Sequence, residues 1–579
     1  MAVQPPAPAP APDAAARDSV TLTLAGSGGD GVALLGDLLL RMAAHQGLYG
    51  MMVQSYGPQI RGGESAVVVR VALEEVQYEG DESDLLLCFR VADLQRFRGG
   101  LRLHPHGVVV LDAADESPLP DWLGRAERAP YRYAFSAAPA GQAAPDPRNM
   151  LALGLIVKAL GWAPALAHRA LEQRFGHRPA LLAADVGAFD RGHATLGVPP
   201  LPRLAGHGVP LVVETGNEAV ARGAMDAGLR FFAGYPITPS SEIMETLIEE
   251  LPGRGGHVVQ AEDEIASLGM VLGASFGNVP AMTATSGPGL SLMTEMMGLS
   301  SMTEIPSVIV DCQRAGPATG MPSRMEQSDL LHAVFGGHGD FPRVVLAALD
   351  VVHARETMHR AFHLSEKYLL PVLVLSDAYI AQRRQIRDAI VETREMPRRR
   401  TWAPQDAPLT LGLEEVVPPF HAPGTPDGTV LIAGLEHDEQ GWPTADGAVH
   451  QRMNERRFHK LPRIAAETAD WYRTLGADVA AYGLVAWGST YGVLREWVRE
   501  HPEYRVFLPE ILEPFPLAAL ERWRAGLRWC AVLEMSYAGQ LHRYLSGLTD
   551  LRGVHRLARS GGLPITLHEI AQRTREALQ

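Results

Sequence analysis

Short apolar runs alternate with amphipathic segments near the start of the chain and predict alternating strands and helices. The run "SVTLTLA" (19–25) is followed by a glycine turn and by the amphipathic segment "VALLGDLLLRMAAHQG". Three more apolar runs, "GESAVVVRVA", "DLLLCF" and "HGVVVLDAA", have the character of buried strands. Strands connected by helices are typical of an α/β sheet with parallel pairs. We therefore expect a first α/β domain over residues 18–200, followed by the Pro- and Gly-rich linker "GVPPLPRLAGHGVP".

The same alternation returns twice further along the chain. Residues 207–385 contain predicted helices such as "SSEIMETLIEEL" and predicted strands such as "PSVIVDCQ" and "LPVLVLSDA", the pattern of a doubly wound domain. Residues 386–470 are charged, then Pro-rich, and are expected to be a linker or irregular segment. Residues 471–579 start a third α/β domain with "VAAYGLVAWGSTYGVLREWVREH". The Pro/Ala-rich residues 1–17 are expected to be a disordered tail.

Composition narrows the class of protein. The chain has 579 residues, of which 46% are hydrophobic and 20% charged, enough for about three or four domains. A net charge of −14 disfavours nucleic-acid binding, which needs a basic face. No apolar run approaches the length of about 18 residues that predicts a membrane span. The opening residues also lack the pattern of a secretory signal, so a cytoplasmic location is expected.

The three cysteines stand far apart in the sequence. Cys88, Cys312 and Cys530 form no CxxC motif, so the sequence contains neither a zinc ribbon nor a redox dithiol. A [4Fe–4S] cluster normally needs four thiolates, which this chain alone does not supply.

The stretch "GSGGDGVALLG" (26–36) matches two cofactor signatures incompletely. Its GDG resembles the diphosphate site of thiamine-diphosphate enzymes, but the first asparagine after Asp30 is the distant Asn149. Gly26, Gly28 and Gly31 spell GxGxxG, yet "MMVQSYG" stands where a nicotinamide site needs an acidic residue. The glycines then either make a tight strand-to-helix turn or cradle a diphosphate at the helix N-terminus.

Three stretches of the second domain carry candidate chemistry. In "AGYPITPSSE" (233–242), Thr238 lies among hydroxyls at a helix start, which suit either a carboxylate or a plain N-cap. In "QAEDEIASLGMVLGASFG" (260–277), three carboxylates precede a helix, where they either favour the N-terminus or include a poised glutamate. In "VDCQRAGPATGMPSRMEQSDL" (310–330), Arg314 follows a strand and suits carboxylate recognition, with Ser323 in the same loop.

These stretches, with "TSGPG" between them, occur in a fixed order within one α/β unit. The order resembles the α subunit of 2-oxoacid:ferredoxin oxidoreductases of the form that has a γ-type domain fused ahead of it. "GSGGDGV" and "SYGPQIRGGES" match the γ-type domain, and "VAWGSTYG" matches the transketolase-C-like domain. The resemblance implies three α/β domains: γ-type, thiamine-diphosphate pyrimidine-binding and transketolase-C-like. "GLEHDEQG" (434–441) matches the region after the pyrimidine domain, and its acidic run is expected to be a loop rather than a metal site.

The resemblance also implies a reaction and a partner. In this family thiamine diphosphate is shared with a β subunit, which holds the diphosphate, Mg²⁺ and a [4Fe–4S] cluster. That accounts for the incomplete GDG site and the missing cluster cysteines. The implied reaction converts a 2-oxoacid and coenzyme A to acyl-CoA and CO₂, or the reverse, with ferredoxin as acceptor and an (αβ)₂ assembly. "MEQSDL" is most similar to the 2-oxoglutarate branch. Pyruvate or broader 2-oxoacid use and a non-catalytic scaffold subunit are the alternatives.

Family roles fall on individual residues of this chain. The family spacing of a glutamate followed by two glycines selects Glu264, with Gly269 and Gly273, rather than Glu262. Glu264 would hydrogen-bond N1′ of the cofactor's aminopyrimidine and is expected to be buried and protonated near neutral pH. The residues expected to contact the 2-oxoacid are Thr238, Arg314 and Ser323, which stands where the family usually has threonine. Those expected near the diphosphate of coenzyme A are Gly28, Gly29 and Arg61.

Overall fold

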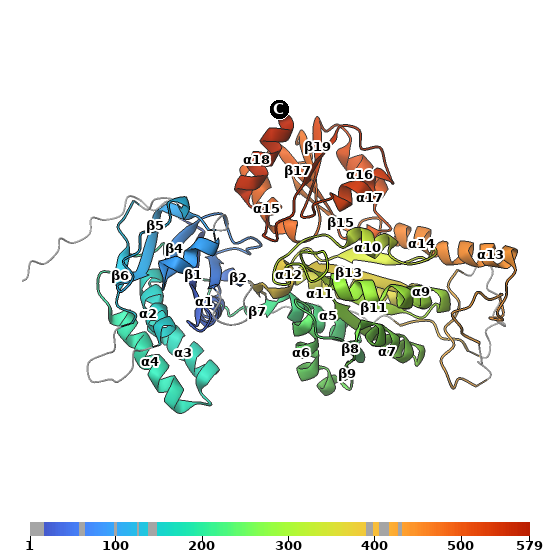
Figure 1. The fold of residues 1–579 in the computed structure, drawn as a ribbon, viewed down its shortest axis with the longest axis horizontal. Helices are drawn as coiled ribbons and strands as arrows, with labels where there is room; N and C mark the ends of the chain where they lie inside the picture. The colour runs from blue at the N-terminus through green and yellow to red at the C-terminus, as the bar shows by residue number, and fades with distance from the viewer. Residues whose placement is uncertain are drawn as a thin grey trace, which may run out of the picture. The chain divides into compact units, whose positions relative to one another are not determined.

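The computed structural model describes residues 17–56, 64–97, 101–123, 127–136, 147–388, 398–403, 416–426 and 431–579. Residues 1–16 of the predicted tail, and Arg61, lie outside the described residues. The chain divides into two compact units. Figure 1 colours the ribbon by residue number, from blue at the N-terminus to red at the C-terminus. Unit 1 comprises Met1–Val213 and Gln385–Ala389, and unit 2 comprises Glu214–Arg384 and Ile390–Gln579.

An eight-stranded sheet forms the centre of unit 1. Its strands, in spatial order, are β6 (Tyr131–Tyr133), β5 (Leu103–Asp112), β4 (Ser83–Cys88), β1 (Ser19–Ser27), β3 (Glu64–Ala72), β2 (Tyr49–Tyr56), β14 (Arg384–Arg387) and β7 (Val212–Thr215). The neighbours β1, β4, β5 and β6 are parallel, as the alternation of strands and helices predicted. The expectation of parallel pairs misses β3, which is antiparallel to both β1 and β2.

Four helices cover one face of this sheet, and two short 3-10 turns lie on the other. The helices are α1 (Val32–His45), α2 (Arg148–Leu160), α3 (Pro164–Phe175) and α4 (Pro179–Ala194), and the turns are η1 (Val91–Phe97) and η2 (Asp121–Leu123). Leu24 and Val67 pack into the large core under the helices, whereas Ala25 and Ala66 belong to the smaller core under the turns. Successive strand residues thus supply opposite cores, as the two-residue period of a strand requires.

Unit 2 is built on a seven-stranded sheet. In spatial order its strands are β18 (Ile511–Glu513), β12 (Val344–Ala347), β13 (Pro371–Asp377), β11 (Ser307–Gln313), β10 (Ala281–Thr285), β8 (Phe231–Gly234) and β9 (His257–Gln260). All neighbours are parallel except β18, which is antiparallel to β12. The predicted doubly wound arrangement is therefore confirmed.

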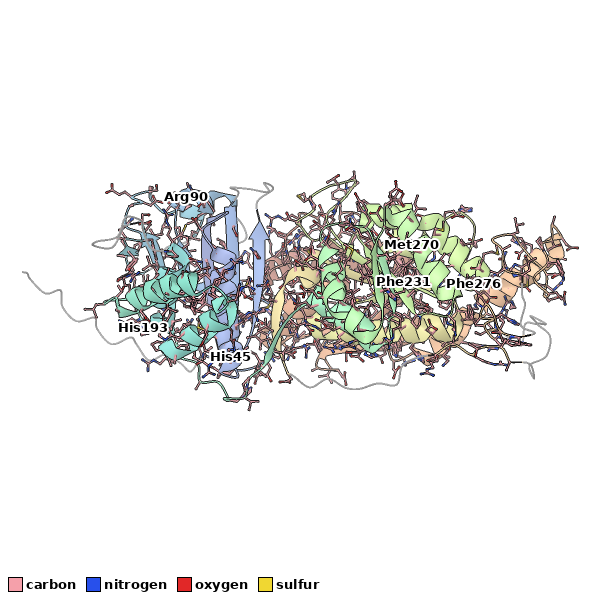
Figure 2. All side chains as sticks on the ribbon, turned by 90° about the horizontal axis from the view of Figure 1, so that it is seen from below. His45, Arg90, His193, Phe231, Met270 and Phe276 are labelled. Atoms are coloured by element: carbon pink, nitrogen blue, oxygen red, sulfur yellow. The ribbon has the colours of Figure 1, made fainter. Side chains whose placement is uncertain are left out.

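Helices cover both faces of this sheet. The core of one face includes residues of α5 (Gly216–Asp226), α6 (Ser241–Glu250) and α11 (Val351–Tyr368), with the short turn η3 (Pro252–Arg254) after α6. The other face is covered by α7 (Glu264–Phe276), α8 (Gly287–Leu292), α9 (Thr294–Thr303) and α10 (Leu330–Phe335). α12 (Ala378–Gln382) follows β13. Figure 2 labels Phe231 on β8 and Met270 and Phe276 on α7.

A five-stranded sheet forms the end of the chain. Its order is β15 (Tyr472–Gly476), β17 (Tyr504–Pro509), β16 (Tyr482–Val485), β19 (Trp529–Glu534) and β20 (Val554–Ala558). All neighbours are parallel except the antiparallel pair β15 and β17. The accompanying helices are η4 (Gly488–Thr490), α15 (Tyr491–Glu500), α16 (Leu517–Arg524), α17 (Gln540–Ser546) and α18 (Leu567–Leu578). The predicted strand, Gly-Ser-Thr turn and helix correspond to β16, η4 and α15.

The stretch expected to be irregular, 386–470, contains two helices that sequence periodicity did not predict. They are α13 (Gly447–Phe458) and α14 (Lys460–Glu467). Arg456 and Lys460 are fully buried and both form ion pairs with Glu304 at the end of α9. These helices dock through buried charges as well as through buried apolar residues such as Met453 and Ile464.

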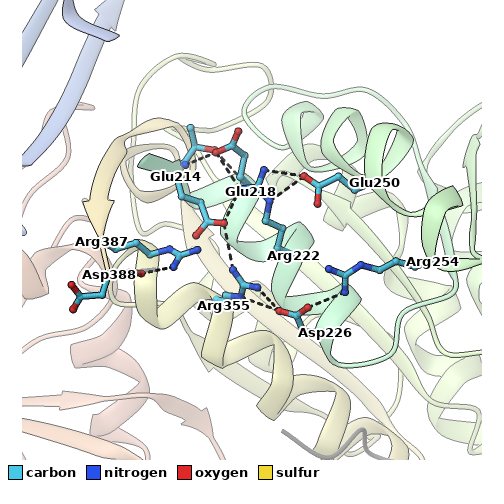
Figure 3. A network of polar contacts seen from close by, with 10 residues as sticks. Glu214, Glu218, Arg222, Asp226, Glu250, Arg254, Arg355, Arg387 and Asp388 are labelled. Atoms are coloured by element: carbon cyan, nitrogen blue, oxygen red, sulfur yellow. Dashed lines mark hydrogen bonds and ion pairs between the residues drawn. The ribbon is translucent and has the colours of Figure 1, made fainter. Parts of the chain in front are cut away.

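A network of ion pairs ties α5 to α11 on one face of the seven-stranded sheet (Figure 3). Arg222 of α5 binds Glu214 at 2.9 Å and Glu250 at 2.9 Å. Asp226, also on α5, binds Arg355 of α11. Burial alone would raise the pKa of Asp226, but its hydrogen bonds to two arginines outweigh burial and lower that pKa. The network fixes these two helices relative to each other.

Candidate functional site

The site residues predicted in unit 2 follow neighbouring parallel strands. Thr238 comes shortly after β8, Glu264 shortly after β9, and Arg314 directly after β11. β9, β8, β10 and β11 are consecutive in the sheet, so their carboxyl ends meet at one edge. Open α/β sheets bind ligands at this edge, which makes it the candidate active site.

Glu264 is the first residue of α7, and it is buried. The Asp263 carboxylate caps the helix by accepting a hydrogen bond from the Ala266 N–H at 2.7 Å. The side chain of Glu264 turns inward, leaving the residue 5% exposed, whereas Glu262 is exposed. Burial of Glu264 agrees with the expectation from its family spacing.

Gly289 of α8 leaves the space that the Glu264 side chain occupies. A Cβ atom at position 289 would lie 2.5 Å from Glu264 Oε1 and 2.1 Å from Thr285 Oγ1. Neither distance is sterically allowed, so the glycine is required for the observed arrangement. The motif "TSGPG" is part of the family resemblance, but the sequence did not predict this contact.

Arg314 and Thr238 are brought together directly. Arg314 Nη1 donates a hydrogen bond of 2.7 Å to the backbone carbonyl of Thr238, while the rest of Thr238 is exposed. Arg314 is 7% exposed. Burial lowers the pKa of the guanidinium, and the nearby charges of Asp329 and Asp311 act in the opposite direction. A buried arginine held at the sheet edge is well placed to bind an anion.

Ser323 lies half-buried in the loop between Arg314 and α10. Within this loop the Met321 N–H donates to the Ala315 carbonyl at 2.8 Å. The third α/β region also fastens the loop, because the Gln327 N–H donates to the Met535 carbonyl at 2.7 Å. Hydrogen bonds therefore hold the loop on both sides of Ser323. Ser323 has a defined position in the loop that follows Arg314.

In unit 1 the glycine turn joins β1 to α1, as predicted. Gly28 and Gly29 are exposed, and Gly29 has a φ of +105° that other residues rarely adopt. The Asp30 carboxylate accepts a hydrogen bond from the Ser27 N–H at 2.8 Å and lies 3.8 Å from Arg148. Arg148 is thus a cation beside the turn that sequence reasoning did not find.

Asn149 is far from the glycine turn in the sequence but close to it in space. A Cβ atom on Gly31 would lie 2.3 Å from Asn149 Nδ2. Asp30 nevertheless uses its carboxylate within the turn and toward Arg148. Among the described residues, no group of three His, Cys, Asp or Glu side chains is arranged to hold a metal ion.

The cysteines belong to three different sheets and are all buried. Cys88 lies in β4, Cys312 in β11 and Cys530 in β19. Burial raises the pKa of Cys88 to about 12 and that of Cys530 to about 11. The three thiols therefore do not fit a shared cluster site.

Two family descriptions match this chain in succession. Residues 21–195 match "Pyruvate ferredoxin/flavodoxin oxidoreductase", and residues 222–456 match "Pyruvate flavodoxin/ferredoxin oxidoreductase, thiamine diP-bdg". The 2-oxoglutarate synthase subunit KorA of Methanocaldococcus jannaschii is 37% identical over 54% of this chain and 85% of that protein. The chain belongs to the α-subunit family of 2-oxoacid:ferredoxin oxidoreductases.

Longer matches support the same 2-oxoacid:ferredoxin oxidoreductase family. The 2-oxoglutarate oxidoreductase subunit KorA of Mycobacterium tuberculosis is 29% identical over 96% of this chain and 91% of that protein. A solved 2-oxoglutarate:ferredoxin oxidoreductase from Magnetococcus marinus, with 2-oxoglutarate, coenzyme A and succinyl-CoA bound, has a TM-score of 0.90 at 33% identity. It covers 97% of this chain and 100% of its own. The three-domain α/β fold is thereby confirmed. No helix in the described residues is long and apolar enough to cross a membrane.

Proposed function

We propose that this α subunit prefers 2-oxoglutarate. With a β subunit it would convert the 2-oxoacid and coenzyme A to acyl-CoA and CO₂, or catalyse the reverse reductive carboxylation. The names of its relatives and the ligands in the Magnetococcus marinus enzyme support this substrate. The observation that carries the proposed thiamine-dependent reaction is the burial of Glu264 against Gly289 at the carboxyl edge of the sheet.

The surroundings of Glu264 fit an aminopyrimidine. Glu264 is 5% exposed, and its side chain lies against Gly289 at the start of α8. A carboxyl in this largely buried position suits a polar partner such as the pyrimidine ring of thiamine diphosphate. Glu264 would orient that ring and hold a proton at the ring nitrogen. When bound, thiamine diphosphate supplies the carbon nucleophile and the electron sink for decarboxylation.

Arg314, Thr238 and Ser323 would bind the 2-oxoacid. One N–H of Arg314 is used by the Thr238 carbonyl, which fixes the guanidinium. Its Nε atom has no acceptor among the described residues, so donor capacity remains for a carboxylate. The hydroxyls of Thr238 and Ser323 would add neutral hydrogen bonds. The chain thereby orients the substrate beside Glu264.

A partner β subunit would supply the diphosphate site, the metal ion and the iron–sulfur cluster of the complex. We infer that the β subunit holds the diphosphate, Mg²⁺ and a [4Fe–4S] cluster, that ferredoxin accepts the electrons, and that the assembly is (αβ)₂. The separation of Cys88, Cys312 and Cys530 over three sheets supports a cluster outside this chain.

At the glycine turn, Gly28 and Gly29 with Arg61 would contact the diphosphate of coenzyme A. A Gly28→Leu variant should raise the KM for coenzyme A without changing that for 2-oxoglutarate.

The proposal is tested by Glu264→Gln in the co-purified α–β complex. The amide keeps the shape of the side chain but does not act as an acid, so turnover of 2-oxoglutarate with ferredoxin should fall by at least about 100-fold. Glu262→Gln, two residues away on the surface, is the matched control and should retain turnover. Full turnover by Glu264→Gln would favour the scaffold alternative. Comparing kcat/KM for 2-oxoglutarate and pyruvate on the native complex decides the substrate preference.

A further inference from the structure

Gln327, in the motif "MEQSDL", is fully buried and joins the loop after Arg314 to the five-stranded sheet. Its side-chain amide donates a hydrogen bond of 2.7 Å to the Trp487 carbonyl and accepts one of 2.9 Å from the Met535 N–H. Its backbone N–H donates to the Met535 carbonyl at 2.7 Å. A buried amide with partners for both its donor and its acceptor atom holds one fixed orientation.

These partners lie at the carboxyl ends of two neighbouring strands. Trp487 follows β16 and Met535 follows β19, and the two strands pair in parallel. Between them, Gly488 has a φ of +59°, and a Cβ atom on it would lie 2.7 Å from Gln327 Nε2. The end of the five-stranded sheet is therefore shaped to receive this one glutamine side chain.

The residues on both sides of Gln327 are tied to the same part of the chain. Before it, the Met325 N–H donates to the Gly562 carbonyl at 3.3 Å. After it, the side-chain carbonyl of Gln540, at the start of α17, accepts a hydrogen bond of 2.9 Å from the Leu331 N–H. The loop is therefore held at several points, with Gln327 at the centre.

The same loop connects the residues proposed to bind the 2-oxoacid. The N–H of Ala315, next to Arg314, donates to the carbonyl of Arg324, next to Ser323, at 2.9 Å. This hydrogen bond closes a turn whose two ends carry Arg314 and Ser323. Gln327 follows Arg324 by three positions, so a displacement of its side chain would move one end of the turn.

We propose that Gln327 is a positioning residue for the 2-oxoacid: it anchors the loop to the five-stranded sheet and so holds Ser323 relative to Arg314. This inference rests on the proposed roles of Ser323 and Arg314 in binding the substrate. Within the described residues, the hydrogen bonds of the Gln327 amide go to the five-stranded sheet and not to α7 or α8, where Glu264 lies. Loss of the anchor should therefore weaken substrate binding more than it slows the chemical step.

Gln327→Met in the complete α–β complex tests the inference. Methionine keeps the length of the side chain and removes both amide hydrogen bonds, so the KM for 2-oxoglutarate should rise by roughly tenfold. The kcat should stay within about twofold of the native value, and the KM for coenzyme A should not change. A native KM for 2-oxoglutarate would overturn the inference, whatever the change in stability. A fall in kcat larger than the rise in KM would also overturn it.

Thr574→Val is the matched control. Thr574 lies in α18, is 3% exposed, and donates from its hydroxyl to the Ile570 carbonyl at 2.8 Å. The variant removes a buried hydrogen bond beside the same sheet but leaves the loop untouched. It should lower the Tm and keep both KM values native. A rise in the KM for 2-oxoglutarate equal to that of Gln327→Met would show that any loss of stability in this region has the same effect, which would overturn the inference.

Gln540→Met keeps the inference testable if Gln327→Met does not assemble. Gln540 is only half-buried, so its replacement disturbs the fold less. The loss of its hydrogen bond to the Leu331 N–H should raise the KM for 2-oxoglutarate by about threefold. An unchanged KM in Gln540→Met would mean that the hold on the loop does not affect binding, and the inference would fail.

Arg314→Gln separates this inference from the function on which it rests. If Arg314 binds the substrate, Arg314→Gln raises the KM for 2-oxoglutarate whatever the role of Gln327. An unchanged KM in Arg314→Gln would refute the binding role of Arg314 itself. A raised KM in Arg314→Gln, combined with a native KM in Gln327→Met, would refute the positioning role alone.

Discussion

Glu264 and Gly289 lie in contact at the carboxyl edge of the seven-stranded sheet. A Cβ atom on residue 289 would lie 2.5 Å from Glu264 Oε1, well inside the van der Waals limit. Glu264 begins α7 and Gly289 lies in α8, so this contact fixes the position of the carboxyl relative to both helices.

Gly289→Ala should therefore displace Glu264 and reduce turnover of the α–β complex. A misplacement of about 1 Å at a catalytic group costs on the order of 100-fold in rate. The control is Gly298→Ala in α9, where the nearest atom to a new Cβ, Phe341 Cε1, is 3.7 Å away. That variant should retain turnover and gain slightly in helix stability. Equal activity in the two variants would show that the position of Glu264 is unimportant.

The geometry of Arg314 leads to a second prediction. One N–H group of Arg314 donates a hydrogen bond to the Thr238 carbonyl. Because the guanidinium is planar, this bond also fixes the direction of its remaining N–H groups. Lysine keeps the charge but not this fork, so Arg314→Lys should raise the KM for 2-oxoglutarate by roughly tenfold or more. The measurement is steady-state kinetics at saturating coenzyme A. Thr238→Val, which keeps the backbone carbonyl, should have a smaller effect; an equal or larger one would assign the main contact to the hydroxyl.

The outer face of α7 leads to a third prediction. Cβ atoms at Gly269 and Gly273 would meet no described atom within 4 Å, and Met270 between them is 41% exposed (Figure 2). The described residues of this chain place no atom against these glycines. We therefore expect the β subunit to pack here. Gly273→Leu should leave the α subunit folded and prevent co-purification of the complex.

Gly253→Leu is the matched control for this interface. Its Cβ would also meet no described atom within 4 Å, and it follows α6 rather than lying in α7. Co-purification should survive this change. If Gly273→Leu also co-purifies normally, the partner binds another surface.

The sequence predicted the strands and helices well where local periodicity determines them. β1, the glycine turn and α1 follow directly from apolar patterning and turn residues, as do β16, η4 and α15. Arg314 could be selected because it follows the buried strand β11. Glu264 could be selected because its spacing to Gly269 and Gly273 matches the family.

Other features depend on contacts between distant residues, which periodicity does not encode. Asn149 is remote from Gly31 in sequence but lies against it. α14 docks through the buried Lys460, whose residue type suggests a surface position.

The buried ion pairs of Glu304 lead to a fourth prediction. Arg456 and Lys460 are both fully buried and share this one carboxylate. Glu304→Ala leaves two buried cations without their counter-charge, which should destabilise the chain by about 3–5 kcal/mol. Glu439→Ala is the control, since Glu439 forms a solvent-exposed pair with Arg452 at 3.2 Å and should cost about 1 kcal/mol or less. Chemical denaturation measures both; similar losses would contradict the prediction.

The same cluster should make stability depend on acid pH. Burial alone would raise the pKa of Glu304, but the charges of Arg456 and Lys460 outweigh burial and lower it to about 2. Because the folded pKa lies below the ordinary value of 4.5, the carboxylate stabilises the fold fully above that pH. Its contribution is lost as the pH falls from 4.5 toward 2. The difference in unfolding free energy between the native chain and Glu304→Ala should accordingly shrink over this interval. A constant difference would mean that Glu304 acts through packing rather than charge.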